Sequence, residues 1–166
     1  MPETTQDYSD RLAGYVDGLD PLIVQQETPD KLARLIHGIP VQQLSGRPEP
    51  GKWSIIEILA HMAEDELVSS WRYRQMIEHD GEVLHGFDQD LWARLGNYGE
   101  WSASEALDLF RLLRNANLRM LRALSPEEWE RSGNHMERGR ITVRELARHM
   151  AAHDINHILQ IEACLR

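Results

Sequence analysis

Three helix starts of one type divide the chain, and they constrain its fold more than any other feature. In each, a hydroxyl residue is followed three residues later by a glutamate: Ser54-Ile55-Ile56-Glu57, Ser102-Ala103-Ser104-Glu105 and Thr142-Val143-Arg144-Glu145. This spacing predicts a capping box, in which the hydroxyl accepts a hydrogen bond from one free amide at the helix start and the glutamate reaches back to another. We therefore expect helices to begin near residues 55, 103 and 143.

Apolar residues recur at helical spacing after each of these starts. The helix from residue 55 to about residue 79 has the apolar arc Ile55, Ile58, Leu59, Met62, Tyr73, Met76 and Ile77. The next helix has the stripe Ala106, Leu109, Leu113, Ala116 and Met120. The last has the arc Val143, Leu146, Ala147, Met150, Ile158, Ile161 and Leu165. Because no alternating strand pattern accompanies these stripes, the sequence predicts an all-α bundle.

Two more helices are expected nearer the N-terminus. A short amphipathic helix should cover Leu12 to Leu19 and end before Asp20-Pro21. Thr28-Pro29-Asp30 combines a hydroxyl cap, a first-turn proline and an acidic residue, which is typical of a helix start. The stretch Ser125-Pro126-Glu127-Glu128 should open a short helical turn.

Glycine-rich stretches interrupt the helical pattern at 80–101 and 133–139, and we expect loops there. The longer one contains the aromatic residues Phe87, Trp92, Tyr98 and Trp101. A long connection of this kind is either a lid over a binding site or a seal for one end of the bundle, and both interpretations remain open.

Composition limits the function classes. A length of 166 residues predicts a single domain covering 1–166. Acidic residues outnumber basic ones 27 to 18, which opposes binding to nucleic acid or anionic membranes. The single cysteine, Cys164, excludes an intrachain disulfide and suits a reducing compartment. With no signal peptide and no membrane-spanning run visible, we expect a soluble cytoplasmic protein.

Histidines recur every four residues in the last helix, at His149, His153 and His157. On a helix this spacing projects neighbouring rings from one face. His157 lies inside the apolar arc, His153 just beyond its edge, and His149 farther toward solvent. We therefore predict that His153 and His157 bind a metal ion and that His149 does not. A helix that merely carries several histidines is the alternative.

His61 has the same relation to the apolar arc of its own helix. Together with His153 and His157 it would supply three neutral nitrogens, leaving a coordination position open as in catalytic sites. Alone, His61 would be interpreted as a histidine at the core edge bonded to a backbone carbonyl. The remaining histidines lie in loops or at helix ends and are interpreted as surface residues: His37, His79, His85 and His135.

Three carboxylates near these histidines are candidate catalytic residues. Glu66 and Asp154 fall within apolar arcs, where a carboxylate needs a partner. They could orient metal-bound imidazoles or transfer protons; alternatively they form an ordinary buried ion pair with an arginine such as Arg72. Asp65, one turn after His61, could act on the nucleophile at the ion. The sequence does not rank the three.

Several motifs in order resemble the DinB-like superfamily, which is unrelated to the DNA polymerase of the same name. They are Gly51-Lys52-Trp53-Ser54, Glu57-Ile58-Leu59-Ala60-His61, Phe87-Asp88-Gln89-Asp90, and His153-Asp154-Ile155-Asn156-His157 with Gln160. The resemblance spans roughly residues 20 to 163. It implies a four-helix bundle of up-down-down-up order, often dimeric, with metal ligands at His61, His153 and His157. Zinc and nickel are the metals it implies.

The resemblance is less informative about the reaction. Some relatives transfer low-molecular-weight thiols such as mycothiol or bacillithiol, and many others are labelled metal-dependent hydrolases. The Arg-Gly-Gln that follows the last metal histidine in some relatives is Ile158-Leu159-Gln160 here, so the role of that arginine does not carry over.

These observations together predict a metalloenzyme that acts on a small molecule, and the resemblance implies a homodimer. The ion would activate water or a thiol, Glu66, Asp65 or Asp154 would carry the proton, and the loop at 80–101 would cover the substrate. Hydrolysis and thiol S-transfer remain equally open. The alternative is a non-catalytic metal-binding module for a stress response or protein interaction. A lined cavity at an open coordination position favours the enzyme, and a fourth protein ligand favours the module.

The rotation of the last helix generates a prediction about its histidines. His149→Ala should keep metal affinity within about tenfold of wild type, the low end for loss of a residue outside the ligand set. His153→Ala should lose far more, and a solvent-facing His149 should titrate near about 6.5. Metal affinities of the two variants provide the measurement. A larger loss at His149 would place the site one turn away.

Overall fold

The computed structural model describes residues 11–166, and helices dominate it. The long helices are α2 (Pro21–Ile36), α4 (Ile55–Glu78), α6 (Ala103–Arg122) and α8 (Val143–Cys164). The shorter ones are α3 (Val41–Ser45), α5 (Gln89–Leu95), the 3-10 turn η1 (Tyr98–Glu100) and α7 (Pro126–Trp129). The strands are β1 (Glu82–Leu84), β2 (Ser132–His135) and β3 (Gly139–Thr142). Residues 11–15 are helical too, in agreement with the expected short N-terminal helix.

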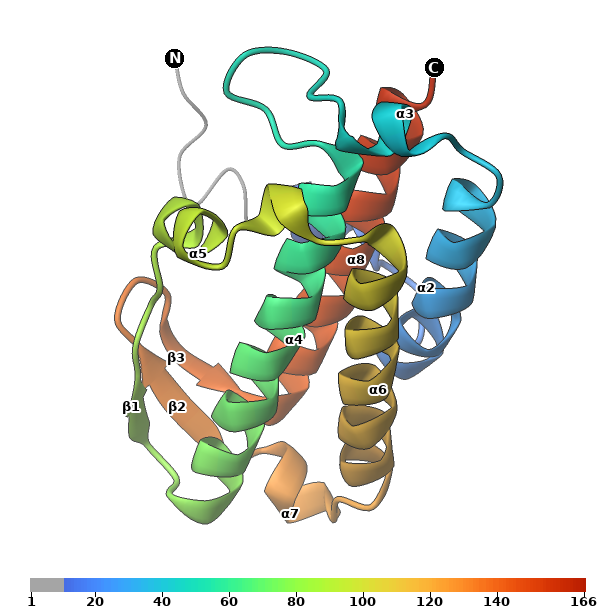
Figure 1. Ribbon diagram of the computed structural model, residues 1–166. Coiled ribbons are helices and arrows are strands. Elements are labelled where there is room, and N and C mark those ends of the chain that lie inside the picture. Colours follow the sequence, from blue (N-terminus) through green and yellow to red (C-terminus); the bar gives the residue numbers. More distant parts are fainter. Residues whose placement is uncertain (1–10) are drawn as a thin grey trace.

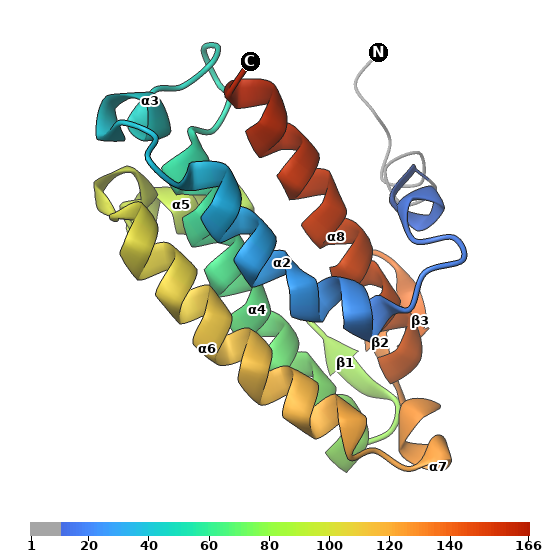
Figure 2. The same ribbon diagram turned by 90° about the vertical axis from the view of Figure 1, so that its right-hand side faces the viewer.

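The four long helices form a bundle in which each contacts two neighbours, α4 with α6 and α8, and α2 with α6 and α8. In Figure 1, α2 and α8 run upward whereas α4 and α6 run downward. Figure 2 shows α2 lying across the face between α6 and α8. The expected all-α four-helix bundle of up-down-down-up order is therefore confirmed. Within residues 11–166, no helix is long and apolar enough to cross a membrane.

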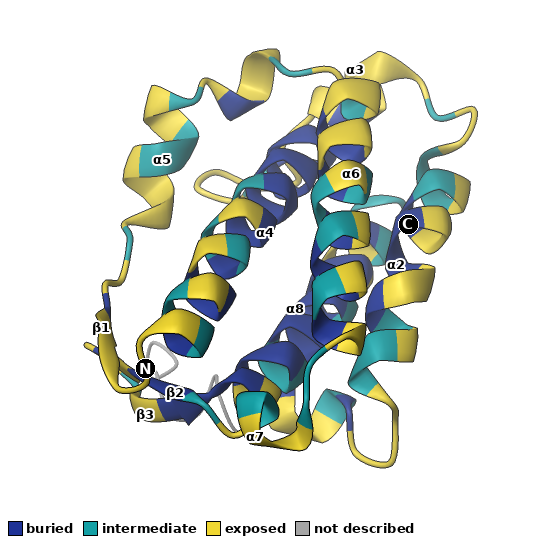
Figure 3. Cartoon of the chain, turned by 90° about the horizontal axis from the view of Figure 1, so that it is seen from below, coloured by how far each residue is buried: buried dark blue, intermediate teal, exposed yellow. Residues whose placement is uncertain are grey.

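All three capping boxes form as predicted, at Ser54, Ser102 and Thr142, and a fourth forms at Ser125. The inward faces of α4 and α8 are buried along most of their length, whereas the outer faces of the bundle are exposed (Figure 3). One apolar cluster fills the upper part of the bundle around Leu59 and Phe110, and a second fills the lower part around Tyr73 and Met150.

Helices α4 and α6 are parallel neighbours, so the chain has to return along the bundle between them. A helix of 24 residues such as α4 is about 36 Å long at about 1.5 Å per residue. The segment 79–102 covers this distance and contains β1, α5 and η1. The prediction of an irregular loop was therefore wrong for this stretch. Asp88 caps α5 by accepting from the amide of Leu91, but α5 has only seven residues and none buried, so no apolar periodicity marks it.

Three short strands also lie in or beside the stretches that were expected to be loops, at 80–101 and 133–139. β1 pairs in parallel with β2, and β2 pairs antiparallel with β3, beside the lower half of α4 (Figure 1). Strands of three or four residues are too short to show alternation. Gly133 was predicted to lie in a loop but lies within β2. The side chain of Leu84 packs over this position, which leaves room only for glycine: a Cβ there would lie 2.5 Å from Cδ1 of Leu84.

Helix α2 begins at Pro21, eight residues before Pro29, where the predicted start with Thr28 as its cap would place the first helical residue. Asp20 caps it by accepting from the amide of Leu22 at 2.8 Å, and Pro21 is its first residue. The hydroxyl of Thr28 bonds back to the carbonyl of Val24 at 2.9 Å instead of capping a helix. Pro29 lies inside α2, and because proline has no N–H, the carbonyl four residues earlier loses its helical partner.

The buried face of α6 differs from the predicted stripe. Leu109 is 37% exposed, whereas Leu107, Phe110, Arg114 and Asn117 face the core with Ala106, Leu118 and Leu121. The apolar pattern predicted the wrong buried face for α6 because two of the residues that face the core, Arg114 and Asn117, are polar. Arg114 is fully buried at 0% exposure.

Arg114 contacts each of the other three long helices. Its Nη1 donates to the carbonyl of Gln25 in α2 at 3.0 Å, which is the carbonyl that Pro29 leaves free. Its Nη2 donates to Glu66 Oε2 in α4 and to Asp154 Oδ1 in α8, each at 2.9 Å. Asn117 adds a bond from Nδ2 to Glu66 Oε1 at 2.9 Å. Both buried carboxylates are thereby paired.

The Arg114 ion pairs generate a stability prediction. Arg114→Met should lower the free energy of unfolding by about 3–5 kcal/mol, because Glu66 and Asp154 would remain buried without a cation. The matched control is Arg111→Met, which removes an exposed arginine of the same helix that pairs with Asp30 at 3.1 Å. That variant should lose less than about 1 kcal/mol. Urea unfolding of both variants tests this, and equal losses would contradict it.

Candidate metal centre

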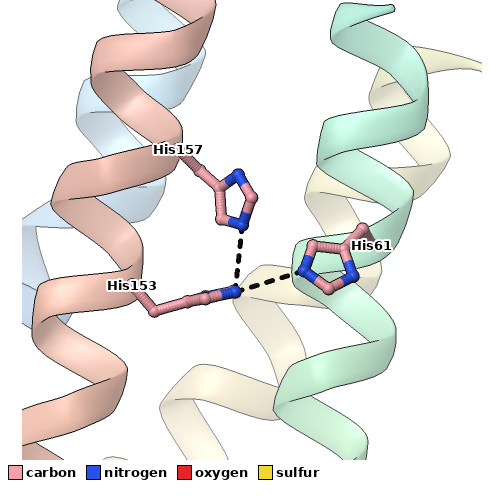
Figure 4. A group of neighbouring side chains, drawn as sticks. All are labelled: His61, His153 and His157. Carbon is pink, nitrogen blue, oxygen red and sulfur yellow. Dashed lines mark hydrogen bonds between the residues drawn. The ribbon is translucent and has the colours of Figure 1, made fainter. Parts of the chain in front are cut away.

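His61, His153 and His157 converge at one point between α4 and α8. The capping box at Ser54 fixes the start of α4, which places His61 seven residues on, and the helical repeat of α8 brings His153 and His157 to the same side. Figure 4 shows the three rings pointing toward one another. His153 Nε2 lies 3.1 Å from His61 Nε2 and 2.9 Å from His157 Nε2. All three side chains are at least 94% buried.

The donor set fits a shared divalent ion. Nε2 of a neutral imidazole carries either one hydrogen or one lone pair, so at most one of the two contacts of His153 Nε2 is an ordinary hydrogen bond. Nitrogens about 2.0–2.1 Å from a tetrahedral ion lie about 3.3 Å apart, close to the spacings observed. A cation would therefore satisfy all three nitrogens at once. In the part of the chain that the structure describes, this is the group of side chains arranged for a metal.

Burial keeps the three rings neutral, which is the form that binds a metal. Burial, followed by the neighbouring His157, holds the pKa of His61 well below its ordinary value. The pKa of His153 is lowered well below its ordinary value by burial and then by His157 and His61. Burial lowers the pKa of His157 to about 4, and the bond to Gln160 opposes this effect.

The Nδ1 atoms of His157 and His153 have polar neighbours that select the tautomer of each ring. Nδ1 of His157 donates to Oε1 of Gln160 at 2.8 Å, since an amide oxygen only accepts. Nδ1 of His153 lies 3.6 Å from Oδ2 of Asp65. Each arrangement favours the N–H at Nδ1 and leaves the Nε2 lone pair for an ion. Nδ1 of His61 is buried without a hydrogen-bond partner among the described residues, and the ring of Trp53 packs against His61 at 4.9 Å.

The three candidate carboxylates divide into two groups. Glu66 and Asp154 form the buried ion pairs, and the arginine is Arg114 rather than Arg72. Arg72 instead donates to the carbonyl of His85 at 2.6 Å. Asp65 faces His153, and burial raises the pKa of Asp65 to about 6, against the opposing effect of Arg72. A role for any of the three in proton transfer stays a prediction.

A cavity of about 640 Å³ opens beside the histidines. His153 and His157 form part of its wall, and the rest comes from residues 48–53, from α5 and from the end of α8. Its polar lining side chains include Glu49, Lys52, Asp90, Asn156 and Gln160. None of the three candidate carboxylates lines it, so the carboxylates nearest to a ligand in this cavity are Glu49 and Asp90, which the sequence analysis did not single out.

Two histidines interpreted as surface residues are not on the surface. His135 lies on β2 with 6% exposure. His149 is partly buried, and burial, together with Arg138, Arg72 and His135, lowers its pKa to about 3 rather than leaving it near 6.5. The sheet and the segment before α5 explain both corrections, because they pack over the N-terminal half of α8. His149 nevertheless lies outside the histidine cluster.

Other residues of the centre were missed for identifiable reasons. Arg114 was not singled out in the sequence, although its spacing of three residues from Asn117 places both on one helix face. Gln160 was noted only as part of a resemblance, yet its position three residues after His157 predicts a contact on a helix. No sequence signal pointed to the packing of Trp53 on His61.

The centre and the fold together generate a prediction about metal removal. Chelation should lower the melting temperature while leaving the helical circular dichroism at room temperature unchanged, because apolar clusters and capping boxes already hold the bundle. Thermal melts with and without chelator provide the measurement. Loss of helical signal at room temperature on chelation would mean that the ion is required for folding.

Comparisons with known proteins agree with this geometry. The chain is 25% identical over 136 residues to "Putative metal-dependent hydrolase OB0782" of Oceanobacillus iheyensis, covering 82% of this chain and 78% of that protein. It is 22% identical over 142 residues to "Putative metal-dependent hydrolase YfiT" of Bacillus subtilis, covering 83% and 80%. The solved structure of YfiT, described as having an unusual four-helix bundle topology, superimposes with a TM-score of 0.81 at 19% identity, covering 99% of this chain and 89% of that one.

A family profile provides the remaining observation. The DinB superfamily profile matches residues 26–161, which includes all four long helices in whole or in large part and every histidine of the cluster. This match extends over most of the chain and agrees with the bundle order and with the motifs around His61 and His153. The chain therefore belongs to the DinB superfamily.

Proposed function

We propose that this protein is a metal-dependent hydrolase acting on a small molecule. One observation carries the proposal: three neutral imidazoles direct Nε2 atoms to one point at the wall of a cavity of about 640 Å³. That volume lies within the range of about 300–1,000 Å³ typical of small-molecule sites. The names of the relatives from Oceanobacillus iheyensis and Bacillus subtilis point to the same reaction class.

His61, His153 and His157 would hold the ion. Imidazole ligands suit zinc and nickel among the divalent metals, and we propose one of these two. A divalent ion bound there would supply Lewis acidity, which makes a water molecule or a thiol nucleophilic at neutral pH.

The residues around the histidines position them. Gln160 accepts the Nδ1 hydrogen of His157, and Asp65 faces the Nδ1 hydrogen of His153, so that both Nε2 lone pairs remain directed inward. Asp65 lies on the side of His153 away from Nε2, and we therefore propose that it is a positioning residue. Glu49 and Asp90, on the wall of the large cavity, are the carboxylates in place to accept a proton from a nucleophile there.

The large cavity favours an enzyme over a non-catalytic metal-binding module. A structural site closes its coordination sphere with a fourth protein ligand. Within residues 11–166 the cluster comprises three histidines and no fourth histidine, cysteine or carboxylate. Two of those histidines line the cavity, so a ligand in it would reach the ion directly.

Thiol S-transfer is the second candidate, and the size of the cavity favours it. A volume of about 640 Å³ corresponds to about twenty water molecules at about 30 Å³ each, which leaves room for a thiol together with an acceptor. Low-molecular-weight thiols would then be the second substrate, and the same three histidines would serve either reaction.

Elemental analysis and activity assays of one set of variants test this proposal. Wild type should bind about one divalent ion per chain and hydrolyse members of a panel of small esters, lactones and amides. His61→Ala and His157→Ala should lose both properties. The matched control is His79→Ala, which removes an exposed histidine after the end of α4 and should retain both.

Two further arms separate the roles of the carboxylates. Asp65→Ala should weaken metal affinity by about 10–100-fold, and Asp65→Asn should restore much of it because an amide oxygen still accepts the Nδ1 hydrogen. Replacing the proton acceptor, by Glu49→Gln or Asp90→Asn, should lower kcat by about 10²–10⁴-fold without metal loss. Full metal content in both histidine variants would overturn the centre, and conjugation of a thiol without hydrolysis would favour the S-transferase.

A further inference from the structure

A second, smaller cavity lies on the other side of His153. Its volume is about 140 Å³, and it is lined by α4, by the segment before α5, by the β2–β3 hairpin and by α8. Its polar walls are formed by Asp65, Arg72, His135, Glu137, Arg138 and His149. His153 also lines it, but apart from His153 and Asp65 none of its residues has a role in the proposed reaction.

Several side chains with hydrogen-bond donors line the small cavity. Arg72 is 92% buried, and the carbonyl of His85 holds its Nη2 at 2.6 Å, which fixes the guanidinium beside the cavity. Arg138 approaches from the hairpin turn, and the rings of His135 and His149 complete the wall. Burial lowers the pKa of His149, and Arg138 and Arg72 lower it further.

The size of the cavity limits what it can hold. At about 30 Å³ per water molecule, 140 Å³ corresponds to between four and five waters, which suits one small anionic group rather than a whole substrate. Two carboxylates, Asp65 and Glu137, share the walls, so a singly charged anion fits better than a doubly charged phosphate. Planar guanidinium groups also match the two oxygens of a carboxylate.

The two cavities share part of their walls beside the histidine cluster. His153 and Gln89 line both of them, so that one side of His153 faces the large cavity and the other faces the small one. A substrate held by a carboxylate in the small cavity would therefore lie beside His153, next to the histidine cluster.

We propose that the small cavity is a carboxylate-binding subsite, in which Arg72 and Arg138 hold the carboxylate of a small organic acid. Its identification as part of the substrate site rests on the proposed function. Binding of the anion itself depends on the two arginines and not on the ion. The proposal thus narrows the substrate class from small molecules in general to carboxylic acids.

Chemical-shift titration with acetate tests the subsite directly, because it measures weak binding residue by residue. In wild-type protein, the signals of residues 85–89, 135–138 and 149 should shift along one saturable curve. Acetamide, which is nearly the same size but neutral, should bind at least about tenfold more weakly. Equal binding of acetamide, absence of saturation, or tighter binding of phosphate than of acetate would each overturn the proposal.

Charge variants of the hairpin and of α4 complete the test. Arg138→Gln should raise the Kd for acetate by about tenfold, whereas Arg140→Gln removes an exposed arginine of the same hairpin outside the cavity and should leave it unchanged. Arg72→Lys keeps the charge and should lose less than Arg72→Gln. Equal effects of Arg138→Gln and Arg140→Gln would show that only the general charge of the surface matters.

A final variant separates this proposal from the metal-dependent reaction. His157→Ala alters the large cavity and the metal centre but does not line the small cavity. It should abolish metal binding and hydrolysis while retaining the acetate shifts of wild type. Loss of those shifts in His157→Ala would overturn an independent subsite. Retained metal in that variant would overturn the metal centre and leave the subsite supported by its own titration.

Discussion

The metal centre depends on the buried ion pairs of Arg114. This residue reaches from α6 to a carbonyl of α2 and to carboxylates of α4 and α8, so one guanidinium sets the spacing of all four helices. Asp154 adjoins His153 in sequence, and Glu66 follows His61 by five residues. The same contacts that pair Glu66 and Asp154 therefore hold His61 opposite His153. Buried charges of this kind are costly unless paired. Here Glu66 and Asp154 share the guanidinium of Arg114, whose Nε is buried without a hydrogen-bond partner among the described residues.

The sequence predicted the histidine cluster because its signals are local. Capping boxes fix where α4 and α8 begin, and the four-residue spacing fixes which face of α8 carries His153 and His157. The rotation of α6 was mispredicted for a complementary reason: apolar periodicity assigns polar residues to the surface, and Arg114 and Asn117 are buried by partners distant in sequence. Such pairing is a property of tertiary structure, which periodicity does not register.

His149 illustrates a different limit. His149 was predicted to lie outside the apolar arc of α8. The surface beside it is nevertheless covered by a sheet whose strands have three or four residues. β1 and β2 pair in parallel although about fifty residues separate them, as in the pair Glu82 and Gly133. Because neither strand carries a pattern of its own, the sequence showed neither the cover over His149 nor the small cavity beneath it.

The distance between the metal ligands along the chain determines when the site can exist. His61 and His153 are 92 positions apart, and α8 leaves the ribosome after α2, α4 and α6. Non-local contacts of this kind form only after the intervening chain has been made. A nascent chain thus exposes His61 without its partners, and a metal ion gains its full ligand set only once α8 has docked. Metal loading of these three histidines would consequently follow the docking of α8.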